Sequence, residues 1–384
     1  MAGDKGLDRR FAFFRFLLAP AISKFFGYRY DALAEVEGPY FLLSNHNTDL
    51  DPVFLGIAAG TGVRFVASEH IAHKGFISRL LLKMFRPILH TKGKAGIGSA
   101  REILETLRGG TSVGLFPEGN RSFYGKTLPI PAVTGKLARR TGVKLVTWRI
   151  EGGYMTQPRW GKGIRRGRIN GKLVGVYEPE TLKAMTDGEV QKLIEHDLYE
   201  DAFETQARLN ASYRSKAPAE GLESALYLCP ACGKIGCMTG RENTLTCSCG
   251  HEWTLTDRML LRDGEGKEIT VDAAAEAQRQ ALRERVERER DSCLFSDDVK
   301  ISRISDHQVK SITVDRLEAY SDHFAFAGKS YAASDISGVA IVGRNTLVVH
   351  LNDESEHLEI RGEIFYSAVK YENLYQIMKE RAGE

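Results

Sequence analysis

Cysteine is absent from the first 228 residues of this 384-residue chain, and five of its six cysteines fall between Cys229 and Cys249. A secreted protein stapled by disulfides would spread its cysteines over the fold, so this clustering argues for a metal site in a reducing compartment. Long apolar runs are absent as well, because no stretch of 18 or more apolar residues occurs. A conventional membrane-spanning helix is therefore not expected.

Acidic residues are scarce in the first part of the chain. The net charge is only +3 overall, but residues 1–170 sum to +15 and residues 171–384 to −12. Clustered positive charge suits an anionic membrane surface, a phosphate-rich compound such as coenzyme A, an acidic carrier protein or a nucleic acid. A solvated basic face that binds nothing is the plain alternative. The length and the 42% hydrophobic content supply cores for two or three domains.

The nearest approach to a membrane helix is the segment 11–26, which is rich in Phe and Leu but carries Arg15, Pro20 and Lys24. Its phenylalanines, next to basic residues, predict a helical segment within residues 1–29 that lies on a membrane surface. A helix packed on the core of the protein is the alternative. Arg15 and the downstream thiols disfavour a cleaved signal peptide.

The pattern of apolar residues divides the rest of the chain into segments. Short strands alternate with helical patterns over residues 30–215, which predicts an α/β domain whose sheet has helices on its faces. The cysteine-rich segment follows at 225–257 and a charged helical connector at 258–293. Short β segments and a final helix at 294–384 predict a small β-rich domain that resembles pleckstrin-homology-like modules.

One polar cluster directly follows an apolar strand and reads Asn-His-Asn-Thr-Asp-Leu-Asp from Asn45 to Asp51. A histidine can take a proton from a hydroxyl near neutral pH, and a carboxylate on its other ring nitrogen fixes the tautomer. On one ideal helix His46 and Asp51 would lie about 140° apart, so at least one of them must lie in a turn. Pro52 favours a helix that begins beside Asp51. A capped loop without catalytic function is the alternative.

A second cluster, Phe-Pro-Glu-Gly-Asn-Arg-Ser from Phe116 to Ser122, also follows an apolar strand. An arginine beside a glycine offers several donors and an unobstructed backbone, which suits a phosphate or a developing oxyanion. An ordinary glycine turn with a solvated arginine is the alternative.

Together the two clusters resemble the double signature of the lysophospholipid acyltransferase family, which includes the 1-acylglycerol-3-phosphate acyltransferases. In this family an Asn-His-x4-Asp motif is followed by Phe-Pro-Glu-Gly-x-Arg-Ser, here about 70 residues later. The resemblance covers about residues 30–215. It implies a glycerolipid acyltransferase-like α/β fold, with a membrane-associated helical segment before it.

The resemblance also implies roles for single residues. His46 would be the general base, and Asp51 would orient it. Glu118, Gly119 and Arg121 would form the acceptor site, with Arg121 binding the phosphate of the acceptor. No covalent acyl-enzyme is implied.

Several positions depart from the family pattern. Where the family usually has an arginine after an apolar strand, this sequence offers His90 with Lys92 close by, and both are assigned to acceptor binding. Asn120 replaces a usual Thr, Thr48 replaces a common Ser, and the strand at 146–148 lacks a usual proline. These changes weaken the prediction of one particular acceptor more than the prediction of acyl transfer.

The implied activity is transfer of a fatty acyl group from acyl-CoA or acyl-carrier protein to the free hydroxyl of a lysophospholipid, first of all lysophosphatidate to phosphatidate. Glycerol 3-phosphate or another lysolipid is the alternative acceptor. The implied place is the cytoplasmic face of a membrane, as a peripheral or monotopic protein of phospholipid biosynthesis. A catalytically inactive protein that binds lipid or nucleic acid is the alternative of another class. The intact motif residues count against it, so nucleic acid is not an expected partner.

The cysteines form two short motifs, Cys229-Pro-Ala-Cys232-Gly and, with 14 residues between Cys232 and Cys247, Cys247-Ser-Cys249-Gly. Paired thiolates on two tight turns are what tetrahedral zinc requires, and four protein ligands leave no open position. The sequence therefore predicts a zinc ribbon with a structural zinc held by Cys229, Cys232, Cys247 and Cys249. His251 or Cys237 could substitute for one ligand.

Overall fold

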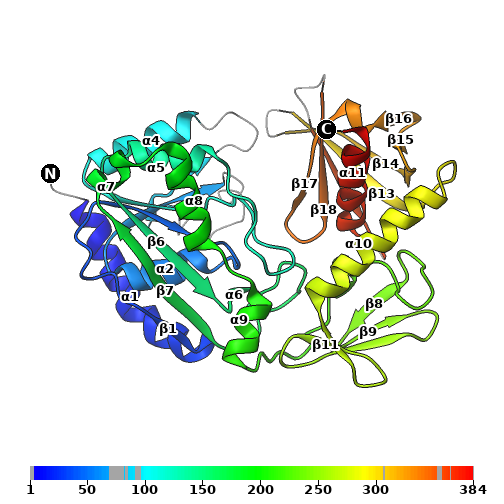
Figure 1. Ribbon diagram of the computed structural model, residues 1–384, viewed down its shortest axis with the longest axis horizontal. Coiled ribbons are helices and arrows are strands. Elements are labelled where there is room, and N and C mark those ends of the chain that lie inside the picture. The colour runs from blue at the N-terminus through cyan, green and yellow to red at the C-terminus, as the bar shows by residue number, and fades with distance from the viewer. Residues whose placement is uncertain are drawn as a thin grey trace. The chain divides into compact units, whose positions relative to one another are not determined.

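The computed structural model describes residues 4–68, 82, 85–90, 97–305, 308–352, 357–363 and 365–383. The chain forms two compact units. The first consists of Met1–Pro158 and Arg165–Tyr213, and the second of Arg159–Ile164 and Arg214–Glu384. Figure 1 shows the elements of both units.

A seven-stranded sheet forms the centre of the first unit, in the order β1-β7-β6-β2-β5-β3-β4. Neighbouring strands are parallel except β6 and β7, which are antiparallel. The strands are β1 (Tyr28–Tyr30), β2 (Tyr40–Ser44), β3 (Val63–Ser68), β4 (Ile88–His90), β5 (Ser112–Leu115), β6 (Lys144–Glu151) and β7 (Ile169–Tyr177). The mixed α/β architecture predicted for this part of the chain is confirmed.

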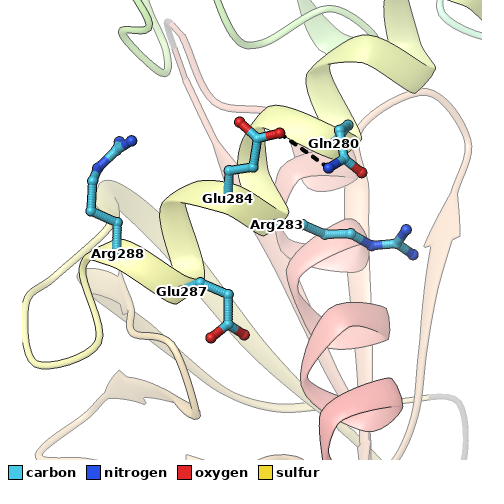
Figure 2. Close-up of a pocket in the computed structure, with 5 residues that line it drawn as sticks. All are labelled: Gln280, Arg283, Glu284, Glu287 and Arg288. Carbon is cyan, nitrogen blue, oxygen red and sulfur yellow. Dashed lines mark hydrogen bonds between the residues drawn. The ribbon is translucent and has the colours of Figure 1, made fainter.

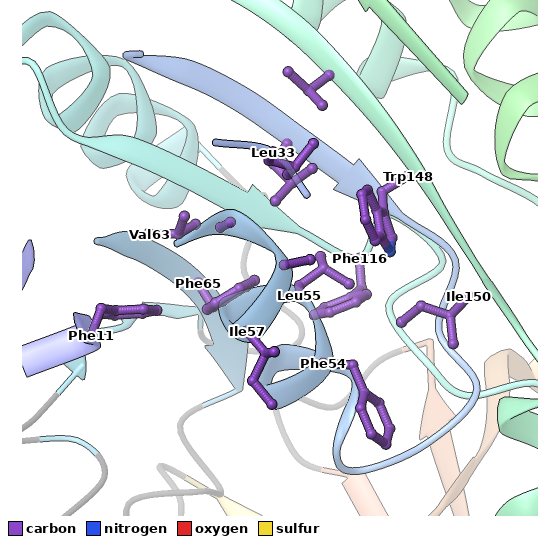
Figure 3. Close-up of a cluster of buried hydrophobic side chains, with 14 of the residues drawn as sticks. Phe11, Leu33, Phe54, Leu55, Ile57, Val63, Phe65, Phe116, Trp148 and Ile150 are labelled. Carbon is purple, nitrogen blue, oxygen red and sulfur yellow. The ribbon is translucent and has the colours of Figure 1, made fainter. Parts of the chain in front are cut away.

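Helices cover both faces of this sheet (Figure 1). They are α1 (Lys5–Phe26), α2 (Asp51–Ala59), α4 (Ile97–Arg108), α5 (Val133–Arg140), α6 (Gly153–Thr156), α7 (Pro179–Ala184), α8 (Asp187–Leu198) and α9 (Ala202–Leu209). Because side chains alternate along a strand, those of β2 contribute to two hydrophobic cores, one on each face of the sheet. Tyr40 and Leu42 pack with residues of α1 and α2, and Figure 3 shows Phe54 and Trp148 of this cluster. Phe41 and Leu43 pack with residues of α4, α5 and α8 on the other face.

Helix α1 has two different faces. Asp4 caps its start by accepting hydrogen bonds from the backbone N–H groups of Gly6 and Leu7, each at 3.0 Å. Leu7 and Phe11 are buried in the core. One face of α1 therefore packs on the protein, as the alternative to a membrane-bound helix expected. Its other face leaves three large apolar side chains exposed: Phe13, Phe16 and Leu17. No helix among the described residues is long and apolar enough to cross a bilayer.

The second unit begins with a small antiparallel sheet in the order β12-β11-β10-β9-β8. Its strands are β8 (Met238–Arg241), β9 (Thr244–Cys247), β10 (Glu252–Leu255), β11 (Leu260–Arg262) and β12 (Glu268–Thr270). Residues 258–270, which were expected in the helical connector, therefore belong to this sheet. The reason is that Met259 and Leu261 are fully buried, so this stretch adds to the core of the sheet and not to a solvated helix.

Helix α10 (Val271–Arg288) follows β12, and the side chain of Thr270 caps it by accepting a hydrogen bond from the N–H of Ala273 at 3.0 Å. Figure 2 shows its charged side, where Gln280 donates a hydrogen bond of 3.1 Å to Glu284 beside Arg283, Glu287 and Arg288. Pairs of this kind stabilise a solvated helix face.

A second antiparallel sheet completes this unit, in the order β16-β15-β14-β13-β19-β18-β17. Its elements are β13 (Phe295–Ser305), β14 (Gln308–Ala319), β15 (His323–Phe326), β16 (Lys329–Ala332), β17 (Ile336–Val342), β18 (Thr346–Leu351), β19 (His357–Gly362) and the helix α11 (Ala368–Ala382). The predicted β-rich C-terminal region with a final helix is thus present, and its likeness to pleckstrin-homology-like modules stays a prediction.

Candidate active site

The two motifs of the first unit leave the sheet at the same edge. β2 and β5 are parallel neighbours, with Leu43 opposite Leu115. The carboxyl ends of parallel neighbours lie side by side, so the segments that follow these two strands meet there. The N–H of Ser122 donates to the carbonyl oxygen of His46 at 3.2 Å, which joins the second motif to the first.

His46 and Asp51 lie in direct contact, with 2.8 Å between Nδ1 of the imidazole and Oδ2 of the carboxylate. Asp51 is the first residue of α2 and is fully buried, whereas 22% of the His46 side chain is exposed. The carboxylate also accepts hydrogen bonds from the N–H groups of Asn47 (2.6 Å) and Thr48 (2.9 Å) and from the Thr48 hydroxyl (2.6 Å). The His46 ring stacks on Phe116 at 4.7 Å between centroids. The imidazole is thereby fixed through Nδ1, and Nε2 is the nitrogen left for proton transfer.

Glu118 is buried, and its carboxylate connects its own loop to the backbone of two other segments. Its Oε1 accepts a hydrogen bond from the N–H of His46 at 2.7 Å, and its Oε2 accepts one from the N–H of Leu128 at 2.6 Å. Burial raises the pKa of this carboxyl to about 8, and the two hydrogen bonds partly oppose that shift. Both oxygens thus bind backbone groups, so Glu118 holds the His46 loop in place. Gly119 follows with a φ of +68°, a conformation that glycine adopts without strain.

Arg121 lies beside the first motif. Its Nε is 3.5 Å from Oδ1 of Asp49, and 13% of its side chain is exposed. Asp49 is held in turn by Gln157, which donates to Oδ2 at 3.3 Å and accepts from the N–H of Asp49 at 3.0 Å. The structure therefore brings the predicted phosphate ligand next to the loop that carries His46.

The other two predicted acceptor residues are His90 and Lys92. His90 ends β4, and its side chain is not among the described groups. Lys92 lies outside the described residues. Their assignment to acceptor binding stays a prediction.

Glu200, which follows α8, was not predicted from the sequence. It is fully buried, and its Oε2 accepts hydrogen bonds from Nδ2 of Asn45 at 3.1 Å and of Asn47 at 2.5 Å. Its Oε1 accepts one from the N–H of Gly152 at 3.2 Å. Glu200 thus ties both asparagines that flank His46 to the end of β6. No local pattern marks it, because it lies more than 150 residues after the motif that it supports.

Glu200→Gln is expected to flatten the dependence of stability on pH. Burial raises the pKa of the Glu200 carboxyl to about 8 from an ordinary 4.5. As the pH rises, the unfolded chain therefore loses this proton first, and the free energy of unfolding falls between about pH 4.5 and 8. The slope is at most about 1.4 kcal/mol per pH unit for one group. Melting temperatures measured from pH 5 to 8 should decline more steeply with pH in the wild type than in Glu200→Gln. Equal slopes in the two proteins would contradict the raised pKa of Glu200.

The predicted metal ligands come together in the second unit. The sulfurs of Cys229, Cys232, Cys247 and Cys249 all lie within 4.8 Å of one another, and among the described residues they form the one group of this kind. The Sγ atoms of Cys229 and Cys249 are 3.7 Å apart, and those of Cys232 and Cys247 are 3.8 Å apart. Zn–S bonds of about 2.3 Å in a tetrahedron place sulfurs about 3.8 Å apart, so the four thiols fit a zinc ion.

Tight turns present these thiols. Gly233 donates its N–H to the carbonyl oxygen of Cys229, and Gly250 donates to that of Cys247. Both glycines have positive φ, +69° and +93°. Cys237 lies nearby, with its Sγ 3.4 Å from that of Cys247, and so remains an alternative ligand.

Comparisons with known proteins bear on the first unit. No curated protein matches the chain. Among solved structures, the crystal structure of the 1-acyl-sn-glycerophosphate (LPA) acyltransferase PlsC from Thermotoga maritima aligns with a TM-score of 0.41 and 18% identity, covering 53% of this chain and 95% of that one. The model of the family described as Acyltransferase matches residues 28–151, which include both motifs. Residues 28–151, which hold the His46–Asp51 pair, are therefore a domain of the acyltransferase family.

Proposed function

We propose that this protein is an O-acyltransferase that moves a fatty acyl group from acyl-CoA or acyl-carrier protein to the free hydroxyl of a lysophospholipid. The observation that carries the proposal is the fixed His46–Asp51 pair inside an acyltransferase-family domain. A buried carboxylate holds one imidazole nitrogen, and the side chain is partly open to solvent. This is the arrangement that a general base for a hydroxyl requires.

The proposed reaction is a direct transfer. Nε2 of His46 takes the proton of the acceptor hydroxyl while the oxygen of that hydroxyl attacks the carbonyl carbon of the thioester. The new C–O bond forms, the C–S bond breaks, and the departing thiolate receives the proton from His46. Asp51 stabilises the imidazolium between these two proton transfers. No residue of the protein carries the acyl group.

The proposed acceptor bears a phosphate, and lysophosphatidate, which would give phosphatidate, is the first candidate. Support comes from Arg121, whose guanidinium lies beside the His46 loop and can donate a pair of hydrogen bonds to phosphate oxygens. His90 and Lys92 would add positive charge. Glycerol 3-phosphate and other lysolipids share the phosphate and stay alternatives.

Transfer of a labelled palmitoyl group tests the proposal. Acyl-CoA and acyl-carrier protein would each be offered with lysophosphatidate, other lysophospholipids and glycerol 3-phosphate, and the products identified by mass spectrometry. A diacyl product from at least one lysophospholipid is expected. If no acceptor is acylated by either donor, the proposal is wrong.

The proposed place of action is the cytoplasmic surface of a membrane, where the protein would sit as a peripheral or monotopic enzyme. Phe13, Phe16 and Leu17 share the exposed face of α1, because residues three and four apart are neighbours on a helix. Lys24 follows near the end of the same helix. Phenylalanines beside basic residues suit the boundary between headgroups and acyl chains.

Phe16→Glu is expected to weaken binding to vesicles of phosphatidylcholine and phosphatidylglycerol about tenfold or more. Burying one phenylalanine contributes about 1.5–3 kcal/mol, and about 1.4 kcal/mol corresponds to a factor of ten. Val133→Glu, which changes an exposed apolar residue on α5, is the control. Vesicle flotation measures both variants. Equal binding by wild type and Phe16→Glu would argue against this role of α1.

The cysteine cluster is proposed to hold a structural zinc through Cys229, Cys232, Cys247 and Cys249. When bound, the ion would supply a four-coordinate cross-link between the two cysteine turns. The donor set leaves no position for a substrate. The small sheet β8–β12 would thus be a zinc ribbon attached to the acyltransferase domain.

A further inference from the structure

The main chain of Glu200 is fixed beside the second motif. Its N–H donates to the hydroxyl of Thr127 at 2.8 Å, and its carbonyl oxygen accepts a hydrogen bond from the N–H of Thr127 at 3.0 Å. The next residue, Leu128, donates its N–H to Glu118, the carboxylate that also holds the N–H of His46. Two consecutive backbone groups thus connect the two buried carboxylates of the site, so the side chain of Glu200 starts from a fixed point.

Asn45 continues the pairing of β2 with β6 after β2 has ended. The last backbone pair of these strands is Ser44 with Trp148. The side-chain amide of Asn45 then bonds both backbone groups of Ile150. Its Oδ1 accepts from the N–H at 2.7 Å, and its Nδ2 donates to the carbonyl oxygen at 2.9 Å. The same Nδ2 donates to Glu200, so the residue directly before the proposed base is held by both the sheet and this carboxylate.

Asn47 connects Glu200 with the carboxylate that holds the proposed base. Its Nδ2 donates to Oε2 of Glu200 at 2.5 Å, and its backbone N–H donates to Oδ2 of Asp51 at 2.6 Å. Oδ2 of Asp51 is also the atom that contacts Nδ1 of His46. The hydrogen bond at one ring nitrogen sets which nitrogen carries the proton. A shift of Asn47 would therefore disturb both the orientation and the tautomer of the imidazole.

We propose that Glu200 is a positioning residue that holds the proposed base His46 in place. It acts through Asn45 and Asn47, and keeps the imidazole against Asp51 with the proton on Nδ1. Its contacts are with the residues on either side of His46, so it acts on the base indirectly. This inference deepens the proposed function and rests on it wherever acyl transfer is the measured quantity.

The groups around the Glu200 carboxylate decide which substitutions test this role. Its donors are two side-chain amides and the N–H of Gly152. Glu200→Leu keeps the side chain long but offers no acceptor, so Asn47 loses its shortest contact and retains only a bond of 3.3 Å to the carbonyl oxygen of Ile150. Glu200→Gln keeps one oxygen, which can accept from both asparagines while its amide nitrogen faces Gly152. This conservative variant should therefore keep the base in place.

Steady-state kinetics of the full-length protein tests the role in acyl transfer. Glu200→Leu should lower kcat about 100-fold and leave KM for the thioester within about threefold, because misplacing a catalytic group by about 1 Å can cost 10²-fold. Glu200→Gln should stay within about fivefold of the wild type, since a lost hydrogen bond contributes about 1 kcal/mol. Asn47→Ala should lower kcat as far as Glu200→Leu, and the double variant no further, because both act through one link. Asn47→Ala carries the same test if Glu200→Leu does not fold.

Glu151→Leu is the matched control. Glu151 is also a buried carboxylate at the end of β6, but it binds Lys172 at 2.9 Å and Arg208 at 3.1 Å. Both partners are about half exposed, so this variant should fold and keep kcat within about twofold of the wild type. A loss of kcat in Glu151→Leu equal to that in Glu200→Leu would indicate a general structural effect and overturn the proposal.

The tautomer of His46 tests the positioning without relying on enzyme activity. In protein with ¹⁵N-labelled histidine rings, the signal that is missing from His46→Ala identifies this residue. At a pH where the ring is neutral, the wild type, Glu200→Gln and Glu151→Leu should carry the proton on Nδ1. Glu200→Leu and Asn47→Ala should show a mixture of both tautomers.

The two readouts separate failure of this inference from failure of the proposed function. An unchanged Nδ1–H tautomer in folded Glu200→Leu and Asn47→Ala would overturn the positioning role, whether or not the protein transfers acyl groups. A wild type that transfers none would contradict the proposed function, while the tautomers would still decide the role of Glu200.

Discussion

His46→Ala is expected to lower kcat/KM for acyl transfer by about 10²- to 10⁴-fold, the range that a positioned general base contributes. The physical reason is that Asp51 holds His46 through Nδ1, while the proposed reaction assigns Nε2 to the hydroxyl of the acceptor. Initial rates of thiol release measure the effect. The expected change is in catalysis and not in folding, because the His46 side chain is partly exposed.

His196→Ala is the matched control for this variant. His196 lies on α8 with 85% of its side chain exposed, so its removal should leave the rate within about twofold of the wild type. In Asp51→Asn, kcat/KM should fall nearly as far as in His46→Ala. The reason is that an amide cannot accept hydrogen bonds at both of its heteroatoms, as this carboxylate does. A rate for His46→Ala close to that of His196→Ala would contradict the assignment of the base.

Cys229→Ser is expected to abolish stoichiometric zinc binding and to unfold the small sheet β8–β12. Structural zinc in small domains contributes about 10–16 kcal/mol of apparent binding free energy, which is also folding free energy. The loss of one thiolate from a set of four should therefore remove most of the stability of this sheet. Mass spectrometry measures the loss of zinc. Hydrogen exchange of residues 238–255 measures the unfolding of the sheet.

Cys293→Ser is the control for the metal site, since Cys293 lies outside the four-cysteine group and is exposed. It should retain one zinc per chain and the exchange protection of the wild type. Cys237→Ser should do the same if the four-cysteine set is correct, and loss of zinc in this variant would assign Cys237 as a ligand instead. Wild-type protein that binds no zinc would contradict the proposal altogether.

The sequence was informative where chemistry and periodicity are local. The two motifs identified the acyltransferase family, and the alternation of strands and helices identified the α/β sheet that brings them to one edge. The separation of His46 and Asp51 required that at least one of them lie in a turn, and Pro52 favoured a helix that begins beside Asp51. α2 does begin at Asp51. The cysteine spacing likewise identified the four thiols that meet in the second unit.

What the sequence did not disclose depends on contacts between distant segments. Glu200 reaches Asn45 and Asn47 only through the folded sheet, so its burial and its hydrogen bonds leave no local pattern. Glu118 was assigned to the acceptor site by resemblance, whereas both of its oxygens accept backbone hydrogen bonds. β11 and β12 were assigned to a helical connector because short strands between polar turns carry a weak periodic signal.

The central claim is that His46 activates a lysophospholipid hydroxyl for direct attack on an acyl thioester. Its most direct test is the release of free thiol from palmitoyl-CoA and from palmitoyl-acyl-carrier protein, measured with and without lysophospholipid in wild type and His46→Ala. The account predicts rapid release in the wild type only when a lysophospholipid is present, one diacyl product for each thiol, and almost none of either in His46→Ala. Equal release by wild type and His46→Ala, or a wild type that releases no thiol with any lysophospholipid, would contradict it.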